Sequence, residues 1–220
     1  MLVLVLDSAT PAITAAIASI GPGPDVTVLS ERVHVDARAH GELLAPNVAA
    51  VLSDVGKAPA DLTAVVAGVG PGPFTGLRVG LVTAAALADT LEIPAYGVCS
   101  LDAIGALAGD GEVLVATDAR RREVYWAIYR DGARVAGPAV DRPADLRLPP
   151  SVRSAVGAGA RLYADAIALP VREELRFPSP NALAVLAAER VLAHAPSEPL
   201  TPLYLRRPDA VEPGARKMVS

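Results

Sequence analysis

Apolar residues dominate three short runs in the first part of the chain. The runs are rich in Val, Ile, Leu and Ala, and short segments containing Asp, Ser, Gly and Pro separate them. Apolar runs of this length, bounded by turn-forming residues, are typical of buried β-strands. The pattern therefore predicts three adjacent strands over residues 2–6, 13–20 and 26–35.

Two helices are predicted from apolar residues that recur at helical spacing. In residues 38–56 a single stripe collects most of them, and Pro46 inside the stripe is expected to kink the helix. Residues 75–91 are apolar on all sides of the helix, with no charge between Arg78 and Asp89. Such a helix must be covered all round, and a sheet covers only one side. We therefore expect the two helices to form an exposed interaction patch, with a wholly intramolecular core as the alternative.

A loop dense in glycine and proline joins a strand over residues 64–69 to the second helix. Glycine amides at a helix N-terminus can bind phosphate. The Walker motif fails because Leu77 and Arg78 follow Gly76. The dinucleotide motif fails because Pro73 takes the place of its third glycine. Two interpretations stay open, an anion cradle and a tight connection whose glycines serve packing.

The second half of the chain resembles a shortened copy of the first. A strand over 93–98 and a helix over 101–108 close the first half, and residues 112–140 then repeat the pattern of three strands. Asp7 and Asp118 end the first strand of each half, about half a chain length apart. This duplication predicts an α/β fold with two ribonuclease-H-like lobes of the actin/Hsp70/sugar-kinase (ASKHA) class, the second lobe reduced.

The predicted domain boundaries follow from this duplication. We expect an N-terminal lobe over residues 1–108, a smaller C-terminal lobe over 109–205 and a flexible tail over 206–220. The clearest helix of the second half runs over 179–194, with Ser179 or Asn181 as its N-cap.

Several polar residues have both a catalytic and a structural interpretation. Asp7, Ser8 and Thr10 could approach the phosphates and metal of ATP, or could form an Asx-type turn. The run Arg120, Arg121 and Arg122 could bind phosphate or RNA, or could be a solvated hairpin tip.

Two further motifs are weighed for nucleotide and metal binding. Gly157 and Gly159 could be the remnant of a nucleotide-binding G-x-G. A metal site at His40 is not expected, because no second histidine follows at helical spacing.

Charge and composition restrict the classes of partner and compartment. The formal net charge of −4 argues against a general polyanion-binding surface, so any nucleic-acid contact must be local or belong to a partner. The single Cys99 cannot form an intrachain disulfide. We find no basic leader at the N-terminus and no stretch approaching the roughly 18 apolar residues needed to span a bilayer. These features predict a cytoplasmic protein with no membrane contact.

The glycine-rich loop also carries a family resemblance. G-P-G-P-F-T-G-L-R-V-G, residues 70–80, resembles the signature of the TsaB (YeaZ) family, although family members usually have Ser where this chain has Pro73. Further matches are H-G-E-L-L-A-P from His40, D-A-R-R-R-E-V-Y from Asp118 and the closing P-L-Y-L-R. The resemblance extends over about residues 1–210.

The resemblance implies a function carried by an interface. It implies a non-catalytic subunit of the tRNA threonylcarbamoyladenosine (t6A37) machinery, a homodimer when alone, which docks on the catalytic homologue TsaD, works with a TsaE-type ATPase and meets tRNA indirectly. No cofactor, metal or catalytic residue is expected. The interface residues expected on the two helices and their loop are His40, Leu43, Leu44, Val48, Val51, Gly70, Phe74, Thr75, Leu77, Arg78, Leu81 and Ala85.

Two rival functions remain. One is an independent enzyme, either an ATP-dependent phosphotransferase using Asp7 and Asp118 or a glycoprotease-like metalloprotease. The other is a simple homodimer that acts as a regulatory or binding module through the same helices.

Overall fold

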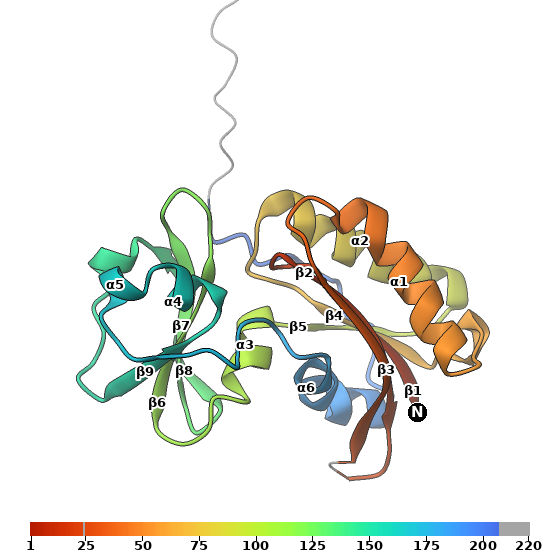
Figure 1. The fold of residues 1–220 in the computed structure, drawn as a ribbon. Helices are drawn as coiled ribbons and strands as arrows, with labels where there is room; N and C mark the ends of the chain where they lie inside the picture. The colour runs from red at the N-terminus through yellow and green to blue at the C-terminus, as the bar shows by residue number, and fades with distance from the viewer. Residues whose placement is uncertain (24, 207–220) are drawn as a thin grey trace, which may run out of the picture.

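The protein folds into two lobes, each built on a five-stranded mixed sheet (Figure 1). The computed structural model describes residues 1–23 and 25–206. The first sheet has the order β3-β2-β1-β4-β5, and its strands are β1 (Leu2–Asp7), β2 (Ala12–Ile20), β3 (Val26–Val35), β4 (Ala64–Gly68) and β5 (Ala95–Val98). Strands β1, β2 and β3 are antiparallel neighbours, whereas β4 and β5 continue the sheet in parallel with β1.

The second sheet repeats this topology. Its order is β10-β9-β6-β7-β8, with strands β6 (Glu112–Asp118), β7 (Val124–Arg130), β8 (Ala133–Asp141), β9 (Val152–Val156) and β10 (Val171–Arg172). Strand β6 pairs antiparallel with β7 and parallel with β9, as β1 does with β2 and β4. The predicted duplication is confirmed, and with it the two ribonuclease-H-like lobes of the actin/Hsp70/sugar-kinase class.

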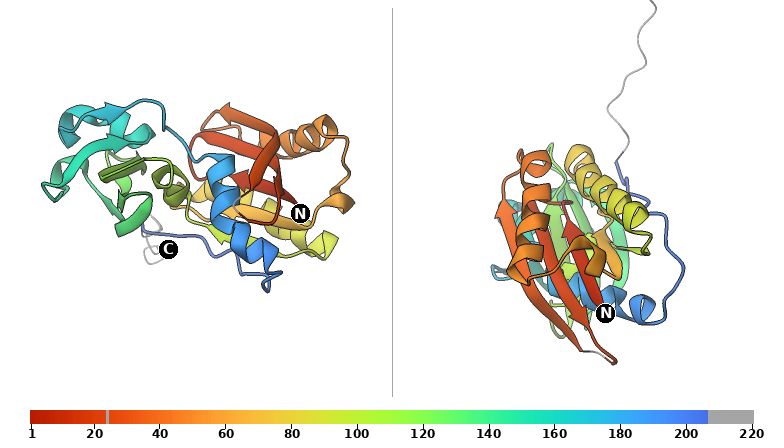
Figure 2. Two further views of the ribbon diagram at one scale, coloured as in Figure 1. Left: turned by 90° about the horizontal axis from the view of Figure 1, so that it is seen from below. Right: turned by 90° about the vertical axis from the view of Figure 1, so that its right-hand side faces the viewer.

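Helices cover the two faces of the first sheet (Figures 1 and 2). The helices are α1 (His40–Asp54), α2 (Phe74–Leu91), α3 (Ser100–Gly105), α4 (Ala158–Leu162), α5 (Ala164–Ile167) and α6 (Pro180–Leu192), with short 3-10 turns at Pro59–Asp61 and Pro143–Asp145. Helices α1 and α2 pack on one face and α6 packs on the other. Because both faces are covered, β1 is apolar on both sides: Leu4 and Leu6 contact the α1/α2 side, while Val3 and Val5 contact the α6 side.

The predicted boundary between the lobes needs correction at the C-terminal end. Residues from α6 onward were assigned to the second lobe, but α6 contacts β1, β2, β3, β4 and β5 of the first. Its alanines and leucines fill the face of the first sheet that α1 and α2 leave open, so the chain returns to where it began. Ser179 is its N-cap, accepting from the Ala182 N–H. The predicted flexible tail lies almost entirely outside the described residues.

Helix α3 joins the lobes. It follows β5 of the first sheet, yet Leu101 and Ile104 pack into a core formed with β6 and β7 of the second. Gly105 lies directly on the Tyr129 ring, since an added Cβ would come within 2.3 Å of it. The Tyr129 hydroxyl donates to Asp102 Oδ1 at 2.6 Å, which fixes the helix to the second sheet.

Candidate functional site

Two loops of the first lobe pack directly against each other at the carboxyl ends of β1 and β4. A Cβ added to Gly72 would lie 2.2 Å from the carbonyl oxygen of Ala9, so the two backbones touch. Ser8 Oγ donates to the Gly76 carbonyl at 2.8 Å and accepts from the Gly80 N–H at 2.9 Å. Gly72 and Gly80 therefore serve close packing between the two loops and the start of the helix that follows.

Asp7 is buried beneath these loops and bonded through both oxygens. Its Oδ2 accepts from Ser100 Oγ at 2.5 Å and its Oδ1 accepts from the Ala9 N–H at 3.1 Å. The bond to Ala9 is the Asx-type contact that one of the two interpretations expected. Burial raises the pKa of Asp7 to about 6, although the bonds from Ser100 and Ala9 work in the opposite direction. Gly68 leaves room for this carboxyl, because a Cβ there would lie 1.8 Å from Oδ2.

His40 holds the start of α1 to the turn after β1. Its Nε2 lies 2.8 Å from the carbonyl oxygen of Thr10, and the side chain is buried. Within residues 1–23 and 25–206, no group of three or more His, Cys, Asp or Glu side chains is arranged to hold a metal ion. The geometry gives His40 a structural contact.

The two glycines considered in the second lobe also serve packing. A Cβ on Gly157 would lie 2.2 Å from the Ala116 carbonyl oxygen, and one on Gly159 would lie 2.5 Å from the Thr117 carbonyl carbon. Both glycines thus let α4 approach the backbone of β6 closely. Asp118, at the end of that strand, accepts from the Arg120 N–H at 2.9 Å.

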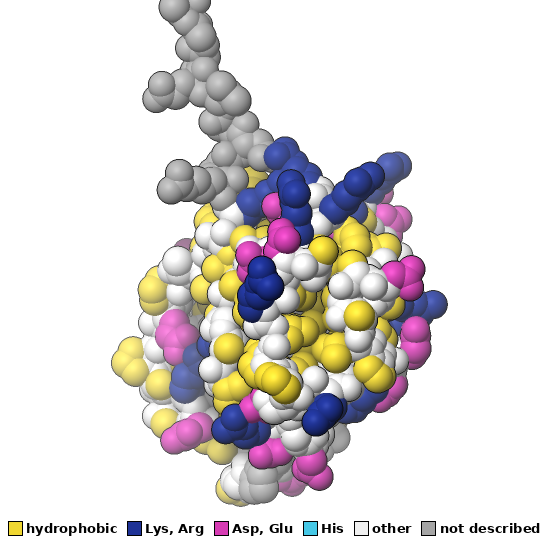
Figure 3. Space-filling model, turned by 90° about the vertical axis from the view of Figure 1, so that its left-hand side faces the viewer, with side chains coloured by type: hydrophobic (Ala, Val, Ile, Leu, Met, Phe, Trp, Pro, Cys, Tyr) yellow, Lys and Arg dark blue, Asp and Glu magenta, His cyan; other side chains and the backbone are white. Residues whose placement is uncertain are grey.

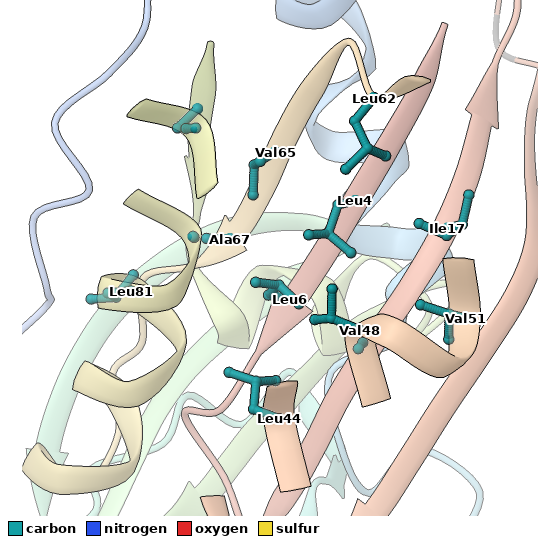
Figure 4. Packing of buried hydrophobic residues seen from close by; sticks show 14 of the residues in the cluster. Leu4, Leu6, Ile17, Leu44, Val48, Val51, Leu62, Val65, Ala67 and Leu81 are labelled. Atoms are coloured by element: carbon teal, nitrogen blue, oxygen red, sulfur yellow. The ribbon is translucent and has the colours of Figure 1, made fainter. Parts of the chain in front are cut away.

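Most of the apolar residues predicted for an interface lie inside the first lobe. Leu44, Val48 and Val51 of α1 and Leu77 and Leu81 of α2 point at the sheet and form one cluster with Leu4, Leu6 and Val65, part of which Figure 4 shows. Gly70 is buried as well. The side chains of these apolar residues and of His40 are at most 8% exposed and offer a partner little surface, although Leu81 also lines a groove described below. The correction has a simple cause, since sheet and helices bury the strongest apolar stripe of each helix first.

The outward face of α2 is nevertheless apolar. Phe74 is 48% exposed and Val82 is 65% exposed, and Ala85 and Ala86 lie on the same surface. Thr75 and Arg78 are exposed too, and Leu43 of α1 is partly buried. An exposed apolar surface is thus present on α2, and only some of its residues were predicted from sequence; that it binds a partner stays a prediction. Helical spacing could have added Val82, four residues after Arg78 on the same face.

The composition of α2 contradicts one expectation from the sequence, which concerns membrane-spanning segments. We expected no stretch long and apolar enough to span a bilayer, but this helix of 18 residues has a mean hydropathy of 1.3 and satisfies both criteria. In the folded chain its inner stripe packs on the sheet. A core helix with an apolar outer face accounts for the same composition.

An extended segment over residues 197–204, which we call the strap, runs beside α2. Backbone N–H groups of Glu198 and Leu203 donate to the carbonyls of Ala95 and Val69, each at 2.9 Å. Arg190 Nη1 also pairs with Glu198 at 2.8 Å. The strap and α2 enclose an apolar groove of about 500 Å³, lined by Arg78, Leu81, Val82, Ala85, Leu200, Pro202 and Tyr204. Sequence reasoning did not find this groove, because the strap has no periodic pattern that indicates its position.

Two of the residues that line the groove, Arg78 and Tyr204, form a stacked cluster with Phe74. The rings of Phe74 and Tyr204 stack with centroids 5.3 Å apart. The Arg78 guanidinium lies 3.8 Å over the Phe74 ring, and its Nε donates to the Tyr204 hydroxyl at 2.7 Å. Aromatic and arginine side chains of this kind are enriched at the energetic centres of protein interfaces.

Comparison with known proteins agrees with this architecture. The family model described as TsaD, tRNA N6-adenosine threonylcarbamoyltransferase, matches residues 27–212. An uncharacterized protein of Mycobacterium tuberculosis is 56% identical over 94% of this chain and 93% of its own length. The tRNA threonylcarbamoyladenosine biosynthesis protein TsaB of Escherichia coli is 36% identical over 59% of this chain and 55% of its own length. The solved structure of YeaZ from Pseudomonas aeruginosa superposes with a TM-score of 0.75 and 25% identity, over 92% of this chain and 100% of that chain. The chain belongs to the TsaB (YeaZ) family.

Proposed function

We propose that this chain is the non-catalytic subunit of a complex that makes threonylcarbamoyladenosine at position 37 of tRNA. In this role it docks on a catalytic homologue of the TsaD type, which works with a TsaE-type ATPase. The name of the E. coli relative supports the pathway. The burial of Asp7, which is bonded through both carboxylate oxygens, and the direct contact of Gly72 with Ala9 favour a supporting role over independent phosphotransfer.

The observation that carries this proposal is the uncovered outer face of α2. Val82, Ala85 and Ala86 form an apolar surface beside the groove of the strap, and nothing in the described chain covers it. Contiguous apolar surface of this kind marks interaction sites on globular proteins. The Phe74, Arg78 and Tyr204 cluster adds the anchor side chains that stable interfaces use.

A partner of the same fold suits this face. The family model that matches this chain is that of the transferase, so a TsaD-type partner has a related architecture with which to meet α2. In the absence of that partner, a second copy of the chain can bind the same face, because the charges on two α2 helices are complementary. Arg78 lies near the start of α2 and Asp89 near its end, so an antiparallel pair of α2 helices brings each arginine to the aspartate of the other copy. A homodimer and a heterodimer then use one exchangeable surface.

Size-exclusion chromatography with light scattering tests the proposal, on the chain alone and mixed with the TsaD homologue of the same organism. Val82→Glu places a charge on the exposed face and should abolish both the homodimer and the heterodimer. Val185→Glu is the matched control, because Val185 is 46% exposed on α6, across the sheet from α2. We expect the control to associate as the wild type does.

Two results contradict the proposal. If the two proteins do not associate and the chain hydrolyses ATP by itself, the phosphotransferase alternative replaces it. If Val82→Glu associates normally while Val185→Glu does not, the interface lies on the α6 side. Glutamate at Leu44, Leu77 or Leu81, three of the interface residues expected from sequence, is unsuitable for this test, because these side chains are buried and the charge would unfold the lobe.

A further inference from the structure

The tip of the β6–β7 hairpin presents three consecutive arginines in an unfavourable backbone conformation. Arg120, Arg121 and Arg122 are all exposed, and their φ angles are 64°, 51° and 63°. Left-handed φ values are uncommon for residues with a Cβ, and glycine or asparagine adopts them at lower cost. The turn thus holds three guanidinium groups at the surface where other residues would be more stable.

Neighbouring residues fix this turn from below. Asp118 Oδ1 accepts from the Arg120 N–H, and the Glu123 N–H donates to the Arg120 carbonyl, each at 2.9 Å. Arg206 Nη1 donates to the Ala119 carbonyl at 3.2 Å, and its Nε lies 3.6 Å from Glu123 Oε2. The tip therefore has a defined shape, held in part by Arg206, which follows the strap in the chain. Strained conformations kept in this way are frequent at functional sites.

The chemistry of the tip fits a phosphate backbone better than a protein surface. Between Asp118 and Glu123 the exposed side chains are the three arginines, and Ala119 is buried. Protein interfaces have an apolar core, which the tip lacks. Contacts to nucleic-acid phosphates, in contrast, need no apolar core, and arginine can pair with a phosphate through two hydrogen bonds. Figure 3 shows Lys and Arg side chains gathered at the upper end of the molecule, where this hairpin lies in Figure 1.

The tip also lies beside the proposed docking face. Arg120 lines a hollow of about 160 Å³ together with Phe74 and Thr75 at the start of α2. We propose that Arg120, Arg121 and Arg122 contact the phosphate backbone of tRNA while the chain is docked on its TsaD-type partner. The inference rests on the proposed function, which supplies tRNA as the substrate of the complex.

Fluorescence anisotropy with labelled tRNA, at several KCl concentrations, tests this contact on the chain alone and on the complex with the TsaD homologue. Neutralising all three arginines (R120Q, R121Q, R122Q) should weaken tRNA binding at least tenfold. It should also reduce the slope of log affinity against log salt by about two, since each lost phosphate contact removes roughly 0.7. Lysine at the three positions keeps the charge and should restore most of the affinity.

The control removes the same charge elsewhere on the second lobe. Arg142, Arg147 and Arg153 are exposed there, and replacing all three with glutamine should leave tRNA affinity within about twofold. Complex formation with the TsaD homologue is measured first by chromatography, so that a failure of docking is distinguished from a failure of the tRNA contact. If the complex forms and the tip variant binds tRNA like the wild type, the contact is refuted while the proposed function stands.

Two other results also refute the tRNA contact. One is a tip variant that loses the TsaD homologue but keeps tRNA, which makes the tip a protein contact. The other is a failure of both the chain alone and any complex to bind tRNA.

Discussion

The buried carboxyl of Asp7 should make the stability of the protein depend on pH in an unusual direction. Its pKa of about 6 in the folded chain exceeds the value of about 3.8 expected when the chain is unfolded. The folded state therefore binds the extra proton more readily between these two values, and the group stabilises the fold more as the pH falls. This contribution is fully present below about pH 4 and is lost as the pH rises through about 6.

The two pKa values give the size of the effect. By proton linkage, the carboxyl contributes almost nothing at pH 8 and about 1.4 kcal/mol of additional unfolding free energy at pH 5. Asp7→Asn keeps the shape of the side chain and removes the titration. The altered hydrogen bonds to Ser100 and Ala9 change the unfolding free energy of the variant by an amount that does not depend on pH. Only the change of that difference with pH reports the carboxyl.

Urea denaturation of both proteins at pH 5 and pH 8 measures the effect. We expect the wild type to gain about 1.4 kcal/mol relative to Asp7→Asn between pH 8 and pH 5. Other carboxyls, such as Asp54, whose pKa is lowered by the hydrogen bond from Ser30, also make the unfolding free energy depend on pH. Their contributions are the same in both proteins and cancel in the comparison. A difference that does not change with pH, or that changes in the opposite sense, refutes the reasoning. Stabilisation of the wild type alone by millimolar MgCl2 would show that the carboxyl binds metal.

Three further substitutions test the packing of the first lobe, each by urea denaturation. Gly68→Ala should lower the unfolding free energy by about 3 kcal/mol or more, since its Cβ would overlap a buried carboxylate oxygen, whereas Gly41→Ala has open space and should be neutral or slightly stabilising. Leu77→Ala should lower the unfolding free energy by about 3 kcal/mol, because the Leu77 side chain is fully buried. Val82→Ala should change it by no more than about 0.5 kcal/mol, because Val82 is exposed, and equal losses in the two variants would contradict the assigned faces of α2. Ser8→Ala should lower the unfolding free energy by about 1–3 kcal/mol because it removes both buried hydrogen bonds of the Ser8 hydroxyl to α2, and an unaffected variant would contradict that role.

The strands and the duplication could be predicted because they depend on local patterns. Residues 2–6, 13–20 and 26–35 were predicted as strands and lie within β1, β2 and β3. The two carboxylates Asp7 and Asp118 do end the equivalent strands of the two sheets. Apolar composition and turn residues determine such features within a few positions of the chain.

Which side of a helix faces solvent could not be predicted in the same way. Leu77, Leu81 and Val82 are all apolar neighbours on α2, and only the position of the sheet makes the first two internal and the third external. The place of α6 depends likewise on a distant partner, the open face of the first sheet. The strap depends on backbone bonds to β5 and Val69, which no side-chain pattern reveals.

Within the described residues, the crossovers of the reduced second lobe contain no helix as long as α1 or α2. In the first lobe, the crossover from β3 to β4 contains the 15 residues of α1, and that from β4 to β5 contains the 18 residues of α2. The equivalent crossovers of the second lobe contain a three-residue 3-10 turn and the short helices α4 and α5, of five and four residues. Helices so short leave no long apolar face for a partner. Under the two proposals, the lobes share one topology and differ in role: the first supplies α2 for docking, and the second supplies the arginine hairpin beside it.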